Sequence, residues 1–344
     1  TIQLLLYLFI NNVYLAGRMD IIGNMRFIPV SSSSGDIENI NVRIPENSEG
    51  IAVSYDLKYV SYKSEDGLVI LDSKSGKPVK TLDARFGEKD KEPGSASPRA
   101  RLDFCRWFPD KNIILYALSA PDDADAKIQI QTYDAESDDL HVGATIKSVS
   151  DGSKVQEAVF STLNMLTYLK VKTDKTRSSV YRINLMDEIS SPFSLASDTT
   201  IKNGYYSENI VCQNSKGQVY LRKTSGQEKR FNIRGKACLI DITGDSSKGK
   251  DIVYIGELDN SGKVTSIYYG LMDEDVSKWT KIVLKNPCLP DNLIVRDSQV
   301  YSFSDDEGSL INLNTSKSVR YKGKFIDFKG GKTVSLKDNT VISN

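Results

Sequence analysis

One pattern of short strands and turns recurs along the chain, and this repeat restricts the fold more than any other feature. From about residue 50 onward, runs rich in Val, Ile and Tyr are separated by clusters of Gly, Asp, Asn, Ser and Lys, as expected for β-strands joined by turns. Residues 52–82 show one unit: a turn at Tyr55-Asp56, a strand, a tight turn at Asp66-Gly67, and further short strands. Long amphipathic helices are not indicated, so the region is predicted to be nearly all β.

The spacing of these units predicts the architecture. Six units are countable, at residues 52–82, 106–140, 158–189, 204–233, 238–284 and 288–323. A period of about 35 to 50 residues with four short strands per unit is typical of propeller blades. The closing segment 324–344 holds only two or three strands, and segment 37–45 offers the missing one. Pairing the first strand with the last closes the ring and removes its open edges.

We therefore predict an all-β fold over residues 26–344, a β-propeller of seven four-stranded blades closed by its N- and C-terminal strands. Six blades are the alternative count, if one of the hairpins forms no unit of its own. A further alternative is a set of isolated hairpins in another all-β fold. A short apolar segment, residues 1–25, precedes the predicted propeller.

The stretch 106–117, RWFPDKNIILYA, shows how one unit is built. Pro109 fixes φ at the turn, and Asp110 caps the backbone two residues on. Trp107 supplies a large aromatic surface that we expect to pack between blades. The apolar strand that follows completes the motif.

This stretch resembles the repeat of TolB-type and dipeptidyl-peptidase-type β-propellers, in which a Trp-Ser-Pro-Asp-Gly turn precedes a strand. The tryptophan, proline and aspartate match, whereas Phe108 replaces the serine and residues 111–112 replace the glycine step. Residues 54–62 are a weaker copy without the proline, so the motif covers about two blades. The resemblance implies a WD40-like propeller fold more than any one function. The hydrolase domain of the related peptidases has no counterpart here, because the repeats occupy the chain.

A second resemblance concerns a possible cation. Segment 241–258 is similar to the calcium loops of integrin-type (FG-GAP) propellers, which place oxygen ligands on alternate residues, because Ca²⁺ takes about six or more oxygens. Ser246 stands where the turn glycine is expected, and two lysines lie in the loop. The loop is therefore either a calcium site or a degenerate copy without metal. The candidate ligands are Asp241, Thr243, Asp245 and Asp251.

Composition removes several classes of function. The 344 residues include 45 basic and 45 acidic side chains, so no overall field favours nucleic acid. His141 is the single histidine, which removes the commonest catalytic designs, and it lies beside a turn-like acidic cluster that favours an ordinary surface position. No nucleophile elbow, P-loop or dinucleotide fingerprint is present. No cofactor is expected apart from the calcium considered above.

The four cysteines show no CxxC spacing, so neither a zinc ribbon nor a thioredoxin-like motif is present. Each lies in or beside an apolar strand-like segment, which favours buried free thiols. One disulfide between Cys238 and Cys288 is the alternative. The cysteines are Cys105, Cys212, Cys238 and Cys288.

The N-terminal segment 1–25 bears on location. Its first part is densely apolar, although a spanning helix needs roughly 20 apolar residues. It is read as the outer end of a membrane anchor or an uncleaved signal, as a packed helix that does not span, or as residues foreign to the native chain. The first reading predicts a membrane-anchored protein that faces the extracytoplasmic side, and a composition rich in Lys, Asn, Ser and Ile suits an AT-rich bacterial genome.

These observations favour a non-catalytic scaffold that binds a protein or an envelope polymer. An exposed aromatic patch on one face of the disc would serve this function, with Tyr205-Tyr206, Tyr268-Tyr269 and Trp279 as candidates, although each could instead lie in the core between blades. One alternative is an enzyme, such as a lyase or a glycan-cleaving propeller, with carboxylates or a metal in its central channel. The other is a module that binds calcium or a small ligand.

Overall fold

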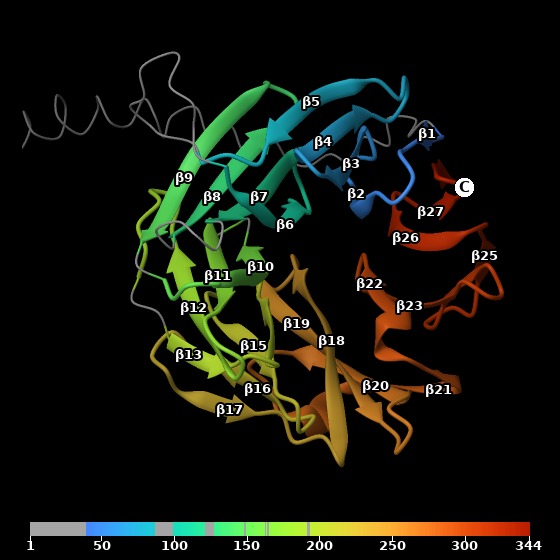
Figure 1. Ribbon diagram of the computed structural model, residues 1–344. Helices are drawn as coiled ribbons and strands as arrows, with labels where there is room; N and C mark the ends of the chain where they lie inside the picture. Colours follow the sequence, from blue (N-terminus) through green and yellow to red (C-terminus); the bar gives the residue numbers. More distant parts are fainter. Residues whose placement is uncertain are drawn as a thin grey trace, which may run out of the picture. The chain divides into compact units, whose positions relative to one another are not determined.

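The computed structural model describes residues 39–86, 99–120, 127–147, 149–161, 163, 165–190 and 193–344. These residues form seven four-stranded antiparallel sheets arranged as the blades of a ring (Figure 1), which confirms the predicted seven-bladed β-propeller. The apolar segment 1–25 and the domain boundary predicted at residue 26 lie outside the described residues, and the propeller falls within Glu38–Asn344. Across the described ranges, no helix is long and apolar enough to cross a membrane.

The first three blades follow the chain in order from the inner strand to the outer one. Blade 1 contains β2 (Glu49–Val53), β3 (Tyr59–Ser64), β4 (Gly67–Asp72) and β5 (Pro78–Asp83). Blade 2 contains β6 (Arg101–Trp107), β7 (Ile113–Ser119), β8 (Lys127–Asp134) and β9 (Asp139–Lys147). Blade 3 contains β10 (Lys154–Ser161), β11 (Leu166–Lys172), β12 (Arg177–Ile183) and β13 (Phe193–Ala196).

The next three blades repeat this order. Blade 4 contains β14 (Thr200–Asn203), β15 (Ile210–Gln213), β16 (Val219–Arg222) and β17 (Glu228–Arg230). Blade 5 contains β18 (Lys236–Asp245), β19 (Lys250–Leu258), β20 (Val264–Leu271) and β21 (Thr280–Cys288). Blade 6 contains β22 (Leu293–Arg296), β23 (Gln299–Ser304), β24 (Ser309–Asn312) and β25 (Ser318–Arg320). Two short 3₁₀ turns, η2 (Val276–Lys278) and η3 (Pro290–Asn292), lie before and after β21.

Blade 7 is built from both ends of the described chain. It contains β26 (Lys324–Lys329), β27 (Lys332–Lys337), β28 (Thr340–Ser343) and β1 (Asn41–Arg43). Val42 of β1 lies opposite Val341 of β28, and the Ile40 N–H donates to Ser343 Oγ at 2.7 Å. The strand expected within residues 37–45 therefore supplies the outer strand of this blade, so the ring closes without an open break between blades.

The hydrophobic core lies between blades rather than within them. The cluster of blades 1 and 2 contains Ile70 and Leu82 from one blade and Trp107, Tyr116 and Leu118 from the other. Equivalent clusters join each later pair up to blades 6 and 7. A strand between two such clusters is buried on both faces, which explains the continuous apolar runs in the sequence.

Trp107 occupies the position predicted for it, in the contact between blades 1 and 2. It is 4% exposed, stacks on Tyr59 with ring centroids 6.0 Å apart, and donates its indole N–H to Ser61 Oγ at 2.9 Å. Asn112, in the expected glycine step, is buried and donates to Asp56 Oδ2 of blade 1 at 3.0 Å. The departure from the usual repeat thus adds a further polar bond between the same two blades.

The turn after Trp107 joins β6 to β7, the first and second strands of blade 2. This blade therefore begins at Arg101, whereas the sequence analysis placed the start of the unit at residue 106. The recognisable part of the repeat is this turn together with the strand that follows it, so the expected unit left out most of the inner strand. All four cysteines are free thiols, and Cys212 and Cys238 are buried. Burial raises the pKa of the Cys212 thiol to about 12 and that of Cys238 to about 11.

Candidate functional site

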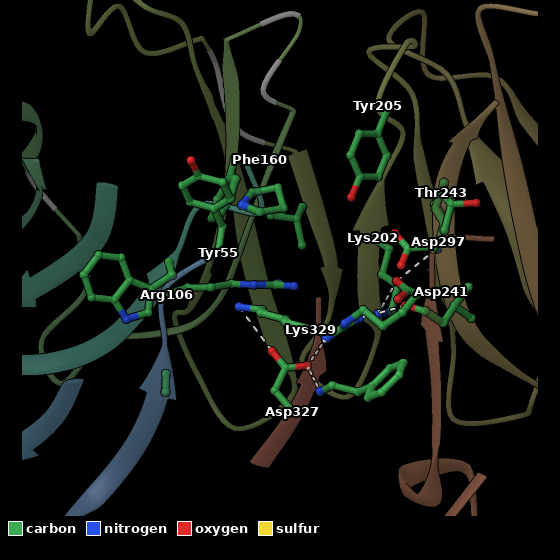
Figure 2. A pocket seen from close by; sticks show the side chains of 18 of the residues that line it. Tyr55, Arg106, Phe160, Lys202, Tyr205, Asp241, Thr243, Asp297, Asp327 and Lys329 are labelled. Atoms are coloured by element: carbon green, nitrogen blue, oxygen red, sulfur yellow. Dashed lines mark hydrogen bonds and ion pairs between the residues drawn. The ribbon is translucent and has the colours of Figure 1, made fainter. Parts of the chain in front are cut away.

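A cavity of about 660 Å³ occupies the central channel of the ring (Figure 2). Its wall contains residues from the inner strand of every blade: β2, β6, β10, β14, β18, β22 and β26. Loop residues after five of these strands complete the lining: Tyr55, Pro109, Tyr205, Tyr206, Asp297, Ser298 and Gly330. All seven units of the repeat therefore contribute to one site, which no single unit of the sequence contains.

The channel wall carries four cationic and four acidic side chains. They are Arg106, Lys202, Arg296 and Lys329, and Glu157, Asp241, Asp297 and Asp327. Sequence reasoning missed most of this set and named only Asp241. One signal was present: from blade 2 onward, each inner strand places a charged residue in the part that reaches the channel.

Blades 6 and 7 hold a compact ionic cluster around Asp327. Arg296 Nη2 lies 2.6 Å from Asp327 Oδ1, and Lys329 Nζ lies 3.2 Å from Oδ2. Burial opposes ionisation of Asp327, but the charges of Arg296 and Lys329 outweigh it and lower the pKa of this carboxyl. Lys329 also donates to the Val53 carbonyl at 2.9 Å, so the cluster joins blade 7 to blade 1.

Arg106 enters the channel from blade 2 (Figure 2). Its guanidinium carbon lies 5.7 Å from the ring centroid of Phe160, a contact that helps to orient the side chain. No carboxylate in the described part of the chain forms an ion pair with it. Burial lowers the pKa of the Lys329 amine, and the nearby charges of Arg296 and Arg106 add to that effect.

Blades 3 to 5 carry a different set of charges. Lys202 Nζ lies 3.0 Å from Asp241 Oδ1, which also accepts the N–H of Ile242. Glu157 Oε2 accepts the N–H of Ile201 at 3.2 Å, and burial raises the pKa of the Glu157 carboxyl. In Figure 2, Asp297 lies on the side of Asp241, away from Arg106.

The loop between β14 and β15 places two tyrosines at the channel. Asp251, 4% exposed, holds this loop: its Oδ1 accepts the N–H groups of Tyr205 (2.6 Å) and Tyr206 (3.0 Å), and its Oδ2 accepts that of Ser207 (3.0 Å). A Cβ atom on Gly204 would lie 2.1 Å from Asp251 Oδ2, so glycine is required for this close approach. The tyrosine loop, residues 204–207, is thus fixed by a buried carboxylate of the next blade.

The four residues predicted as calcium ligands are engaged with different partners. Thr243 and Asp241 line the channel, and Asp241 is paired with Lys202. Asp245 lies at the tip of the β18–β19 hairpin, where it caps Ser247, and Asp251 holds the tyrosine loop. Within the ranges that the structure describes, no group of three or more His, Cys, Asp or Glu side chains is arranged to hold a metal ion. The calcium site stays a prediction that a titration can test.

The other sequence candidates lie elsewhere. His141, from β9, contacts Asp187 of the loop after β12 at 3.0 Å and is exposed outside the channel. Trp279 is buried in the core of blades 4 and 5, 5.3 Å from Phe231, so of the two positions considered for it, the core between blades is the one it occupies. Tyr269 stacks on Tyr254 at 5.3 Å, whereas the tyrosines of the 204–207 loop face the channel.

Comparison with known proteins supports the architecture. No family model and no curated protein matches the chain. Among solved structures, the Cps50 (Swd1) β-propeller domain of Myceliophteria thermophila has a TM-score of 0.52 at 12% identity, over 89% of this chain and 98% of that one. The β-propeller domain of the Trilobed protease from Pyrococcus furiosus gives 0.52 at 11% identity, over 86% and 89%.

A prolyl endopeptidase is similar with a TM-score of 0.50 at 12% identity, over 83% of this chain but only 46% of the endopeptidase. At these identities the similarity shows the fold alone. The Pyrococcus furiosus domain has an open velcro topology, whereas β1 closes blade 7 of this chain.

Proposed function

We propose that this chain is a non-catalytic, TolB-type β-propeller that acts as a scaffold for a protein partner. We further propose that the scaffold is bacterial and is tethered to a membrane on the extracytoplasmic side. The observation that carries the proposal is the 204–207 loop, which places the partly exposed Tyr205 and Tyr206 in the wall of a channel formed by all seven blades. Tyrosines in a rigid setting are frequent anchors of protein interfaces.

The rigidity of this loop supports a binding role. The three N–H groups that Asp251 accepts fix the backbone before any partner arrives, so less conformational entropy is lost on binding. A catalytic role for the channel carboxylates has less support, since Asp241 and Asp327 are each paired with cations. The tether rests on the apolar composition of residues 1–25 alone.

The test is an affinity capture with the full-length chain as bait and the solubilised envelope of the source organism. Three forms are compared: the wild type, the double variant Tyr205→Ala/Tyr206→Ala, and the control Leu185→Ala/Met186→Ala, whose side chains are 64% and 77% exposed. We expect one protein to be enriched by the wild type and the control but not by the tyrosine variant. Equal capture by all three forms, or none by the wild type, would refute the interface.

Two further measurements complete the test. Thermal unfolding of each variant shows whether a loss of capture reflects unfolding instead of a lost contact. Protease protection in intact cells addresses the tether: an extracytoplasmic chain is cleaved by protease added outside the cytoplasmic membrane. A captured polymer that survives protease treatment would replace the protein partner with an envelope polymer.

A further inference from the structure

We propose that the central channel contains an oxyanion-binding site formed by Arg106, Arg296 and Lys329, which takes a small phosphate or carboxylate ligand. This site lies in the same cavity as the tyrosines of the proposed protein interface but uses other residues, and the proposal does not depend on that interface. The three cations belong to blades 2, 6 and 7, and all of them line the same cavity.

The first argument is local charge. Arg296 and Lys329 share one carboxylate, Asp327, and Arg106 lies close enough to Lys329 for its charge to act on that amine. Glu157 is near enough for the charge of Arg106 to act on its carboxyl, but the two form no ion pair within the described residues, and Asp241 is already paired with Lys202. A bound oxyanion would supply the paired counter-charge that Arg106 lacks in the described part of the chain.

The second argument is that the Asp327 carboxylate already has three partners. Its Oδ1 accepts from Arg296 at 2.6 Å and from the Phe328 N–H at 2.8 Å, and its Oδ2 faces Lys329 at 3.2 Å. It therefore has little capacity left for Arg106. A guanidinium offers five N–H donors, and those of Arg106 find no carboxylate partner in the described ranges.

The third argument is orientation. Figure 2 shows the Arg106 side chain extending from the wall into the channel, in the same part of the view as Lys329. The Phe160 ring lies beside the guanidinium, and the Arg106 side chain is still exposed. A planar guanidinium binds carboxylate or phosphate through two parallel hydrogen bonds, and a neighbouring ammonium adds a point charge. Burial lowers the pKa of Lys329, and a bound anion would favour its charged form again.

The experiment is a calorimetric titration of the full-length chain at constant ionic strength, with inorganic phosphate in one arm and succinate in the other. Chloride at the same ionic strength is the blank. Thermal unfolding in each anion gives a second readout, because a ligand of the folded state raises Tm. Tighter binding of phosphate or of succinate identifies which oxyanion the site prefers.

The decisive variant is Arg106→Gln, which removes no ion pair within the described residues. The matched control is Arg320→Gln, which removes the same charge from β25, outside the channel wall. We expect Arg106→Gln to weaken binding about 10- to 100-fold, the loss typical of a charge-assisted hydrogen bond, and Arg106→Lys to retain part of it. The control should bind as the wild type does.

Two outcomes would overturn the proposal. One is the absence of both binding heat and a Tm shift with either anion at millimolar concentration. The other is equal weakening by Arg106→Gln and Arg320→Gln, which would mean that the anions associate only with the general surface charge. Unchanged unfolding of Arg106→Gln without ligand separates a lost contact from a damaged fold.

Discussion

The two sides of the channel wall use the same kinds of charged side chain but balance them differently. Around Asp327, the cations of blades 2, 6 and 7 outnumber the carboxylate. On blades 3 to 5, Lys202 is the single channel cation, beside Glu157 and Asp241. The difference is also visible in the pKa values: that of Asp327 is lowered by its cationic neighbours, whereas burial raises that of Glu157. Sequence composition, with equal numbers of acids and bases, hides this local separation.

The largest expected effect comes from removing the acid of the cationic side. Asp327→Asn leaves Arg296 and Lys329 without their counter-charge in a buried setting, which should lower the free energy of unfolding by about 3 kcal/mol. Urea unfolding at neutral pH measures it. The control Asp273→Asn breaks an exposed pair with Lys250 and should cost less than about 1 kcal/mol. Equal effects of the two substitutions would mean that the Asp327 cluster contributes no more to stability than an exposed ion pair does.

The same cluster predicts a pH dependence. Because the folded-state pKa of Asp327 lies below its unfolded value, the stabilisation is fully present above the unfolded pKa of about 3.9 and is lost as pH falls through the lower folded pKa. The stability difference between wild type and Asp327→Asn should therefore shrink only below about pH 4. Unfolding curves from pH 3 to pH 7 provide the check.

The contribution of Glu157 to stability should change with pH in the opposite direction. Its folded-state pKa is raised, so the favourable contribution of the protonated carboxyl is present below the unfolded pKa of about 4.3 and is lost as pH rises through the folded pKa. Glu157→Gln keeps an oxygen for the Ile201 N–H and removes the buried charge. We expect it to raise stability at pH 7 by up to about 1 kcal/mol and to have no effect at acid pH. A loss of stability at pH 7 would contradict the contrast between the two sides.

Added calcium should have the smallest effect on the stability of the protein. Asp241 is paired with Lys202, and Asp251 accepts three backbone N–H groups, so neither carboxylate is set up to bind a cation. We expect added calcium to leave Tm unchanged, as measured by thermal unfolding at constant ionic strength. A rise in Tm that disappears in Asp241→Ala/Asp245→Ala would instead establish the predicted calcium loop.

The sequence predicted the fold well because each blade is defined by short-range signals. Turns such as Asp66-Gly67 and the aromatic motif at Trp107 act within one unit, and repetition of the unit implies the ring. Trp279 was harder to place, since a tryptophan near a turn serves equally well in a core or on a surface. Only its contact with Phe231 of the preceding blade resolves this choice.

The site was less predictable because its contacts cross from one unit to another. Arg296 of blade 6 forms an ion pair with Asp327 of blade 7, and Lys329 donates a hydrogen bond to the carbonyl of Val53, 276 residues earlier in the chain. The spacing around Asp251 suggested a metal ligand, but its partners belong to the previous unit. Such pairings follow from ring closure and from the exact register of inner strands, which local patterns leave open. From blade 2 onward, the charged residue in each inner strand was the sequence feature that could have predicted the channel site.

The pairing of β1 with β28 has a consequence for how the molecule is made. Ile40 and Ser343, joined by a hydrogen bond, are 303 residues apart, so the first described strand must wait without its partner while the other blades are synthesised. During translation, six blades can assemble in succession through contacts with their neighbours, but the seventh can be completed only after the last strand has left the ribosome. A nascent chain stalled before Thr340 would expose an unpaired edge of β27 together with a free β1, the kind of surface that chaperones recognise and that a second nascent chain could pair with.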